Sequence, residues 1–175
     1  MTSHLNWGLP LAAWLLSPAI LGIINRVKAF FAGRKGPSLW QPYYDLFKLL
    51  RKGSVYSRST TGLLRAAPAV VLACMAVCTT ILPWGKLQAP VGFLGDVILL
   101  AYLLGLARFA TVLAALDTGS SFEGMGASRE VQYAALAEPS FFLGMLVLVL
   151  HSGFQGLSGI ISGVAVHAGH GRGLP

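Results

Sequence analysis

Four long apolar stretches constrain the fold of this 175-residue chain more than any other feature. A helix needs roughly 20 apolar residues to cross the hydrocarbon core of a bilayer, and each stretch approaches that length. Hydrophobic residues make up 55% of the chain and charged residues only 11%, whereas soluble domains carry about 25% charged residues. The sequence therefore predicts an all-α, polytopic membrane protein and excludes disordered and ordinary soluble chains. We expect membrane spans at residues 9–31, 66–82, 97–116 and 131–150.

Positive charge gathers between the first two expected spans. Nine of the 13 lysine and arginine residues lie between Arg26 and Arg65. Inside this segment, residues 41–52 are expected to form an amphipathic helix, because apolar side chains recur at helical spacing from Tyr43 onward. That helix is too short to cross a membrane, so it should lie in the interface or against partner helices.

The distribution of charge also predicts the topology. Cytoplasmic loops of membrane proteins are enriched in lysine and arginine, so the basic first loop should be cytoplasmic and the N-terminus external. The next loop carries a single charge, Lys86, and should be external. The net charge of +7 is thus explained by a membrane surface, and we expect no nucleic-acid partner. The glycine- and serine-rich residues 151–175, with His167 and His170, are expected to form a mobile external tail.

Two charged residues fall inside expected spans. Arg108 lies about 12 Å from the cytoplasmic end of the third span, and Glu138 about 10 Å from the same end of the fourth. An isolated charge at such a depth costs roughly 2.5–3.5 kcal/mol on insertion scales, so both should face the protein interior. Two interpretations remain open: a purely structural ion pair, or proton conduction by Glu138.

The segment between the third and fourth spans, residues 117–129, is expected to be a polar, glycine-rich loop. It contains Asp117, Gly119, Glu123 and Arg129, and Ser128 is expected to cap the fourth span. Its glycines resemble half of a phosphate loop, but the required lysine is absent. With Glu130 and Glu138, the acids of this loop would form a ladder that enters the membrane from the cytoplasm and suits proton passage.

Metal and redox ligands are sparse. Cys74 and Cys78 are one helical turn apart in the second span, which does not complete a metal site. No cysteine cluster, haem motif or catalytic triad is present in the sequence. We therefore expect no catalytic residue, metal or cofactor in this chain.

Two segments resemble a known family. They are GRKGPSLWQPYYDLFKLLRK, which runs from Gly33 to Lys52, and LDTGSSFEGMGASRE, which runs from Leu116 to Glu130 and is followed by Glu138 and Pro139. Both are similar to the membrane subunit shared by respiratory complex I (subunit 1, or H) and the group 4 [NiFe] hydrogenases. The closer resemblance is to the hydrogenase branch, of the formate hydrogenlyase subunit 4 and hydrogenase-4 component C type.

This resemblance implies a function. The subunit would anchor a hydrophilic redox module in the inner (plasma) membrane and link it to antiporter-like, ion-translocating subunits. The [NiFe] centre and iron–sulfur clusters would reside in the large and small hydrogenase subunits. The proton path would use Asp117, Glu130, Glu138 and Arg108, while Arg129 would line its opening. The docking surface for the hydrophilic arm would comprise Arg34, Gly36, Pro37, Gln41, Asp45 and Lys48.

Family members are nearly twice as long, so the chain is expected to correspond to their N-terminal half, with the second half lost or on another chain. Two alternatives stay open. One is a complex I-type subunit with a quinone site against the first loop. The other is a fragment that acts only as a membrane scaffold.

Overall fold

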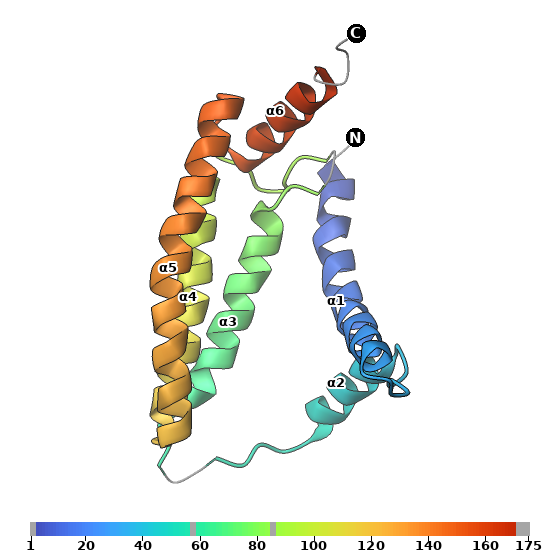
Figure 1. The fold of residues 1–175 in the computed structure, drawn as a ribbon, viewed down its shortest axis with the longest axis vertical. Helices are drawn as coiled ribbons and strands as arrows, with labels where there is room; N and C mark the ends of the chain where they lie inside the picture. Colours follow the sequence, from blue (N-terminus) through green and yellow to red (C-terminus); the bar gives the residue numbers. More distant parts are fainter. Residues whose placement is uncertain (1–2, 57–58, 85–86, 171–175) are drawn as a thin grey trace. The chain divides into compact units, whose positions relative to one another are not determined.

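The computed structural model describes residues 3–56, 59–84 and 87–170. Within them lie α1 (Ser3–Phe31), α2 (Gln41–Arg51), α3 (Gly62–Ile81), α4 (Asp96–Asp117), α5 (Ser121–Ser152) and α6 (Leu157–His170) (Figure 1). Four of these helices are long and apolar enough to cross a bilayer: α1, α3, α4 and α5. The expectation of an all-α polytopic membrane protein is therefore confirmed. Arg58, Lys86 and the side chains of His167 and His170 lie outside the described part of the chain.

The chain divides into two units, the first of which extends to Tyr56 and contains α1 and α2. The expected amphipathic helix is α2, whose first turn contains a proline. Proline suits that position because the first backbone N–H groups of a helix lack intrahelical partners. The Tyr43 hydroxyl donates a hydrogen bond to the Leu15 carbonyl oxygen at 2.6 Å, which fastens α2 to α1. The helical glycine Gly22 lets the Leu39 carbonyl approach α1 closely, because a Cβ there would collide with that oxygen.

The second unit, described from Ser59 onward, is built on the antiparallel pair α3 and α4. Helix α5 packs along α4, and α6 packs against α5 (Figure 1). A hydrophobic core joins three of these helices at the end where α3 finishes and α4 begins. Its buried members are Cys78, Ile81, Val97, Leu100, Leu157 and Ile160. This core fixes one end of the helix bundle, and the charged residues lie farther along it.

The structure corrects the prediction of a loop at residues 117–129, because most of this segment is helical. Helix α5 begins at Ser121, ten residues before the expected start of the span, and residues 118–120 alone separate it from α4. Gly119 has a φ of +69°, which lets the chain reverse there. Ser128 is not a cap: it lies inside α5 and donates a hydrogen bond to the Met125 carbonyl at 2.9 Å. Glycines are common in membrane helices, where neighbouring packing stabilises the backbone.

The structure also corrects the prediction of a mobile tail at residues 151–175, because residues 157–170 form α6. The Asp96 carboxylate, 1% exposed, accepts a hydrogen bond from the backbone N–H of Leu157 at 2.8 Å. The backbone N–H of Ala89 donates to the Ser158 hydroxyl at 3.2 Å. Asp96 thus satisfies the first N–H of α6, which is one of the groups that a helix leaves unpaired.

Candidate intramembrane charge site

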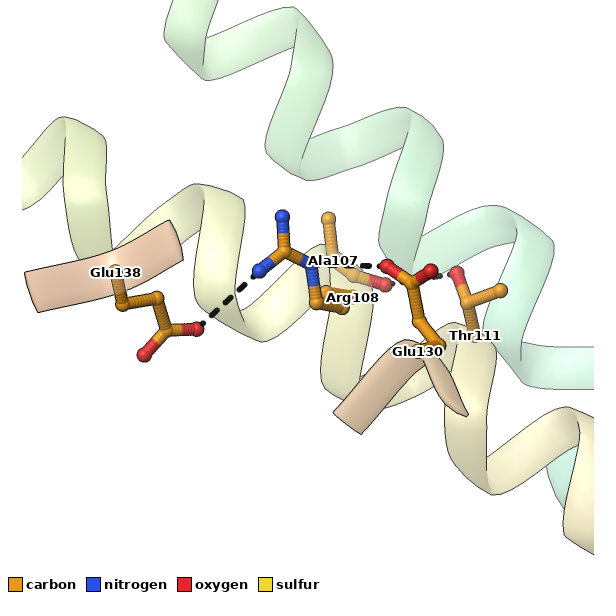
Figure 2. A network of polar contacts seen from close by, with 5 residues as sticks. All are labelled: Ala107, Arg108, Thr111, Glu130 and Glu138. Atoms are coloured by element: carbon orange, nitrogen blue, oxygen red, sulfur yellow. Dashed lines mark hydrogen bonds and ion pairs between the residues drawn. The ribbon is translucent and has the colours of Figure 1, made fainter. Parts of the chain in front are cut away.

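Arg108 on α4 lies between two glutamates of α5 (Figure 2). Its Nε lies 3.2 Å from Glu130 Oε1, and its Nη1 lies 3.6 Å from Glu138 Oε1. Nearby on α4, the Thr111 hydroxyl donates a hydrogen bond to the Ala107 carbonyl oxygen at 2.9 Å. The ion pair between Arg108 and Glu138 that the sequence predicted is therefore present. The contact with Glu130 was missed, although the equal spacing of the two residues from the α4–α5 turn could have indicated it.

Because α5 begins ten residues earlier than expected, both glutamates lie farther from its N-terminal end than the sequence predicted. Glu130 lies nine residues after Ser121, about 14 Å along the helix, and Arg108 lies about 14 Å from the opposite side of the same turn. The two are thus level. Glu138 is a further two turns, about 12 Å, along α5. Arg108 therefore connects a carboxylate at its own level with one that lies about two turns farther from the α4–α5 turn.

The charge triad of Arg108, Glu130 and Glu138 is not electrically balanced. One guanidinium faces two carboxylates, which gives a formal charge of −1 when both carboxyl groups are ionised. The side chains of Glu130 and Glu138 are 53% and 54% exposed within this chain. A proton, a cation or a partner's basic side chain would complete the balance.

Two grooves open on either side of the triad. The first, of about 690 Å³, lies between α4 and α5 and contains Glu138, with apolar walls that include Tyr102, Phe109 and Phe142. The second, of about 540 Å³, lies among α3, α4 and α5 and contains Glu130 and Glu123. Arg108 lines both grooves, so its two ion pairs face two different surfaces of the unit.

Asp117 lies apart from the triad, at the last residue of α4. It accepts hydrogen bonds from the Thr61 hydroxyl at 2.6 Å, the Thr61 backbone N–H at 2.9 Å and the Leu64 backbone N–H at 3.1 Å. The backbone donors belong to the start of α3, where Thr61 is the capping residue. Asp117 thus joins the end of α4 to the start of α3, an arrangement that the sequence did not reveal.

The remaining residues of the α4–α5 segment do not join the triad. Glu123 is in the first turn of α5, where a carboxylate is favoured by the helix dipole. Arg129 is exposed on α5. Gly119 belongs to the turn between the two helices. Of the acids expected to form a ladder, the structure brings Glu130 and Glu138 to Arg108 and leaves Asp117 and Glu123 nearer the turn.

The six residues expected to dock a hydrophilic arm all lie in the first unit. Gly36 packs closely on α1, since an added Cβ would lie 3.0 Å from the Ala29 Cβ. Pro37, Gln41 and Asp45 line a groove of about 320 Å³ against α1. The Gln41 side-chain amide donates to Asp45 Oδ1 at 3.1 Å. The other two, Arg34 and Lys48, are exposed.

Metal ligands do not converge in the described residues: no group of three or more histidine, cysteine, aspartate or glutamate side chains could hold an ion there. Cys74 and Cys78 are free thiols, both buried on α3. Their burial agrees with a packing role.

These features define a multi-pass, all-α membrane protein with a charge network between two of its spans. The chain belongs to the NADH dehydrogenase family, which residues 8–167 match. It is 40% identical to hydrogenase-4 component C of Escherichia coli (strain K12) over 139 residues, which are 79% of this chain and 44% of that protein. It is 36% identical to formate hydrogenlyase subunit 4 of the same organism over 150 residues, which are 86% of this chain and 49% of that protein. The chain thus spans about half the length of these curated relatives, and its resemblance to hydrogenase membrane subunits is confirmed.

Proposed function

We propose that this chain is a membrane subunit of a group 4 [NiFe] hydrogenase complex, of the formate hydrogenlyase type, and that it links the redox module to ion-translocating subunits. The observation that carries the proposal is the similarity to two hydrogenase components in a chain that keeps an arginine–glutamate network between two membrane helices. Charged groups inside membrane helices are costly and typically mark ion or proton pathways.

The triad can exchange protons without leaving a net charge in the membrane. If one carboxyl group holds a proton, Arg108 neutralises the other, and the group as a whole carries no charge. Because the guanidinium already contacts both glutamates, it can pair with either one while the proton moves to the other. On this proposal Glu130 and Glu138 are alternate proton carriers. Asp117, about 14 Å from Arg108 along α4, marks the cytoplasmic opening of the path, near Gly119, Glu123 and Arg129.

The redox centres would belong to partner subunits. On this proposal the [NiFe] large subunit and the iron–sulfur small subunit sit on the cytoplasmic side, where the basic first loop offers a platform. The docking residues are Arg34, Gly36, Pro37, Gln41, Asp45 and Lys48. Antiporter-like subunits would lie beside the chain in the inner (plasma) membrane. Exposed apolar side chains on α2, such as Phe47 and Leu50, support a surface that is covered by lipid or by partners.

The first test is to tag the chain, extract it gently from its native membrane and identify its partners by mass spectrometry. Recovery of a [NiFe] large subunit with antiporter-like chains is expected. Recovery of the chain alone would contradict the proposal and favour a scaffold or fragment without coupled activity.

The second test separates assembly from coupling. Glu138→Gln and Glu130→Gln should leave the complex assembled but reduce proton translocation per hydrogen formed, measured in inverted vesicles. Gln132→Ala removes a polar side chain from the same helix and serves as the control. Unchanged proton translocation in both glutamate variants would contradict the proton-carrier roles.

A complex I-type function is the second candidate, and the match to the NADH dehydrogenase family favours it. The groove in the first unit combines apolar Leu21 and Leu49 with polar Asn25 and Gln41, which suits a ring with carbonyl acceptors. Bound quinone in the extracted complex, with quinone-dependent activity, would support this function. Hydrogen turnover without quinone would contradict it.

A further inference from the structure

Helix α5 contains a proline directly after Glu138, inside its membrane-spanning part. Proline has no backbone N–H, so Pro139 cannot donate the helical hydrogen bond to the carbonyl oxygen four residues earlier, that of Ala135. The helix nevertheless continues on both sides of the proline, from Ser121 to Ser152. The Ala135 carbonyl therefore lacks its helical donor in the turn of α5 that precedes Glu138.

The hydroxyl groups nearby do not replace the missing donor. Ser140 donates its hydroxyl to the Leu136 carbonyl at 2.8 Å, and Thr111 on α4 donates to the Ala107 carbonyl at 2.9 Å. Within the described part of the chain, no side chain donates a hydrogen bond to the Ala135 carbonyl. Hydrocarbon supplies no donor either, and an unsatisfied carbonyl is costly in a membrane. The Ala135 carbonyl is thus an acceptor that requires a donor.

Glu138 lies on the correct side of α5 to supply that donor. Ala135 and Glu138 are three residues apart, so they share one side of the helix. Side chains of a helix slant toward its N-terminus, which directs the Glu138 carboxyl group back along the turn that contains Ala135. An ionised carboxylate only accepts hydrogen bonds, whereas a protonated carboxyl group donates one. A proton on Glu138 can therefore bond to the Ala135 carbonyl, directly or through one water molecule.

The two protonation states of Glu138 then have different partners. Its Oε1 lies 3.6 Å from Arg108 Nη1, which is the partner of the ionised form. Glu130 lies nearer the same guanidinium, at 3.2 Å, so Arg108 can neutralise Glu130 when Glu138 is protonated. No other charged group faces Glu138 from the described residues of the helices packed on α5. The two aspartates of α4 lie at its ends, and the described side chains of α6 include no acid or base.

We propose that Pro139 is a positioning residue for proton transfer: it leaves the Ala135 carbonyl open as the acceptor that stabilises Glu138 in its protonated form. When a proton passes from the Glu130 carboxyl group to the Glu138 carboxylate, Arg108 neutralises the Glu130 carboxylate and the triad stays uncharged. This inference deepens the proposed function, because it rests on proton exchange within the triad. It adds an acceptor for the proton on Glu138 and names the residue that creates that acceptor.

The test follows the carboxylic-acid band of Glu138 by infrared difference spectroscopy of the extracted complex during a pH titration, with Glu138→Gln to assign the band. Pro139→Ala restores an N–H donor to the Ala135 carbonyl. At a fixed pH it should lower the ratio of protonated to ionised Glu138 about fivefold, the effect of losing one hydrogen bond, and should move the band to higher frequency. Proton translocation per hydrogen formed should also fall. An unchanged band in Pro139→Ala, or no acid band of Glu138 at any pH, would overturn the inference.

Two further variants separate the restored donor from other effects of the substitution. Pro139→Gly supplies the same N–H with a more flexible backbone, so it should lower the ratio as Pro139→Ala does. A normal band in Pro139→Gly would assign the effect to helix stiffness and contradict the inference. Pro68→Ala removes a proline from α3 that lines neither groove, and it should leave the band unchanged. Equal losses in Pro68→Ala and Pro139→Ala would also contradict the inference.

If neither Pro139 variant accumulates, the unsubstituted complex decides. With isotope-labelled alanine carbonyls, protonation of Glu138 should shift one labelled carbonyl band, and Glu138→Gln should abolish that shift. Absence of a labelled shift would refute the inference. The two proposals fail in different ways. Purified chains without a hydrogenase would contradict the proposed function while the carbonyl shift stood, whereas an insensitive band in a proton-translocating hydrogenase complex would contradict the inference alone.

Discussion

Arg108 sets the charge balance of the second unit, since one guanidinium serves two carboxylates. We expect Arg108→Gln to destabilise the protein by about 2 kcal/mol. Breaking a buried pair costs about 3–5 kcal/mol, and the half-exposed state of these carboxylates reduces that figure. The thermal midpoint in detergent, measured for the extracted complex, reports the change. Arg108→Gln combined with Glu138→Gln should recover part of the loss, because it removes one unpaired carboxylate. Strict additivity of the two substitutions would contradict the pairing.

Gly22 tests the close contact between α1 and the segment before α2. A Cβ at this position would collide with the Leu39 backbone carbonyl, and a backbone atom cannot rotate away. Gly22→Ala should therefore destabilise the first unit by about 1–3 kcal/mol and increase protease cleavage between α1 and α2. Gly8→Ala is the matched control: it lies on the same helix, and nothing lies within 4 Å of its added Cβ. Equal cleavage in the two variants would contradict the contact.

The contacts of individual residues could be predicted from the sequence where the free-energy cost of an unpaired charge in a membrane span requires a partner. An arginine and a glutamate in expected spans must be paired, and the structure pairs Arg108 with Glu138. The role of Asp117 was not predictable, because it depends on α3 starting beside the end of α4. The proton-path roles of the same acids stay a prediction.

At the scale of helices, Asp117 acts as a cap in trans for α3, through two backbone N–H groups and the Thr61 hydroxyl. Asp117→Ala should destabilise the start of α3, because the side chain that satisfies its first backbone N–H groups is lost. Hydrogen exchange of the amides at residues 61–65 should quicken. Ser120→Ala is the control, because the Ser120 side chain makes no capping hydrogen bond to α5. Unchanged exchange in Asp117→Ala would show that the cap does not hold the start of α3.

Asp96 attaches α6 to the end of the bundle through the Leu157 N–H. Asp96→Ala should leave that donor unsatisfied, at a cost of about 1–3 kcal/mol, and should speed hydrogen exchange at residues 157–160. Asp96→Asn keeps an acceptor oxygen and should restore most of the protection. If the two variants exchange equally fast, the hydrogen bond is not what holds α6.

The two corrections concern helices that tertiary contacts stabilise. Residues 119–126 contain three glycines, which in water would favour a loop, yet α5 packs along α4 and continues through two of them. A tail is expected over residues 157–170 from their glycine and serine content, although Leu157, Ile160 and Val164 recur at helical spacing. The Asp96–Leu157 hydrogen bond that holds α6 joins residues 61 positions apart. The apolar core also joins α6 to residues of α3 and α4, and no local sequence pattern reveals such distant contacts.

At the scale of the whole molecule, orientation across the membrane decides from which side the proposed redox module could approach. The basic residues between α1 and α3 predict a cytoplasmic location for that segment, and the segment between α3 and α4 should then be external. Ser54→Cys and Gln88→Cys place single reactive thiols in these two segments. The native Cys74 and Cys78 are buried and should remain unlabelled in intact cells. A membrane-impermeant maleimide should therefore label Gln88→Cys in intact cells and Ser54→Cys only in inverted vesicles. The opposite pattern would place the proposed docking surface on the outside, where a cytoplasmic hydrogenase module could not reach it.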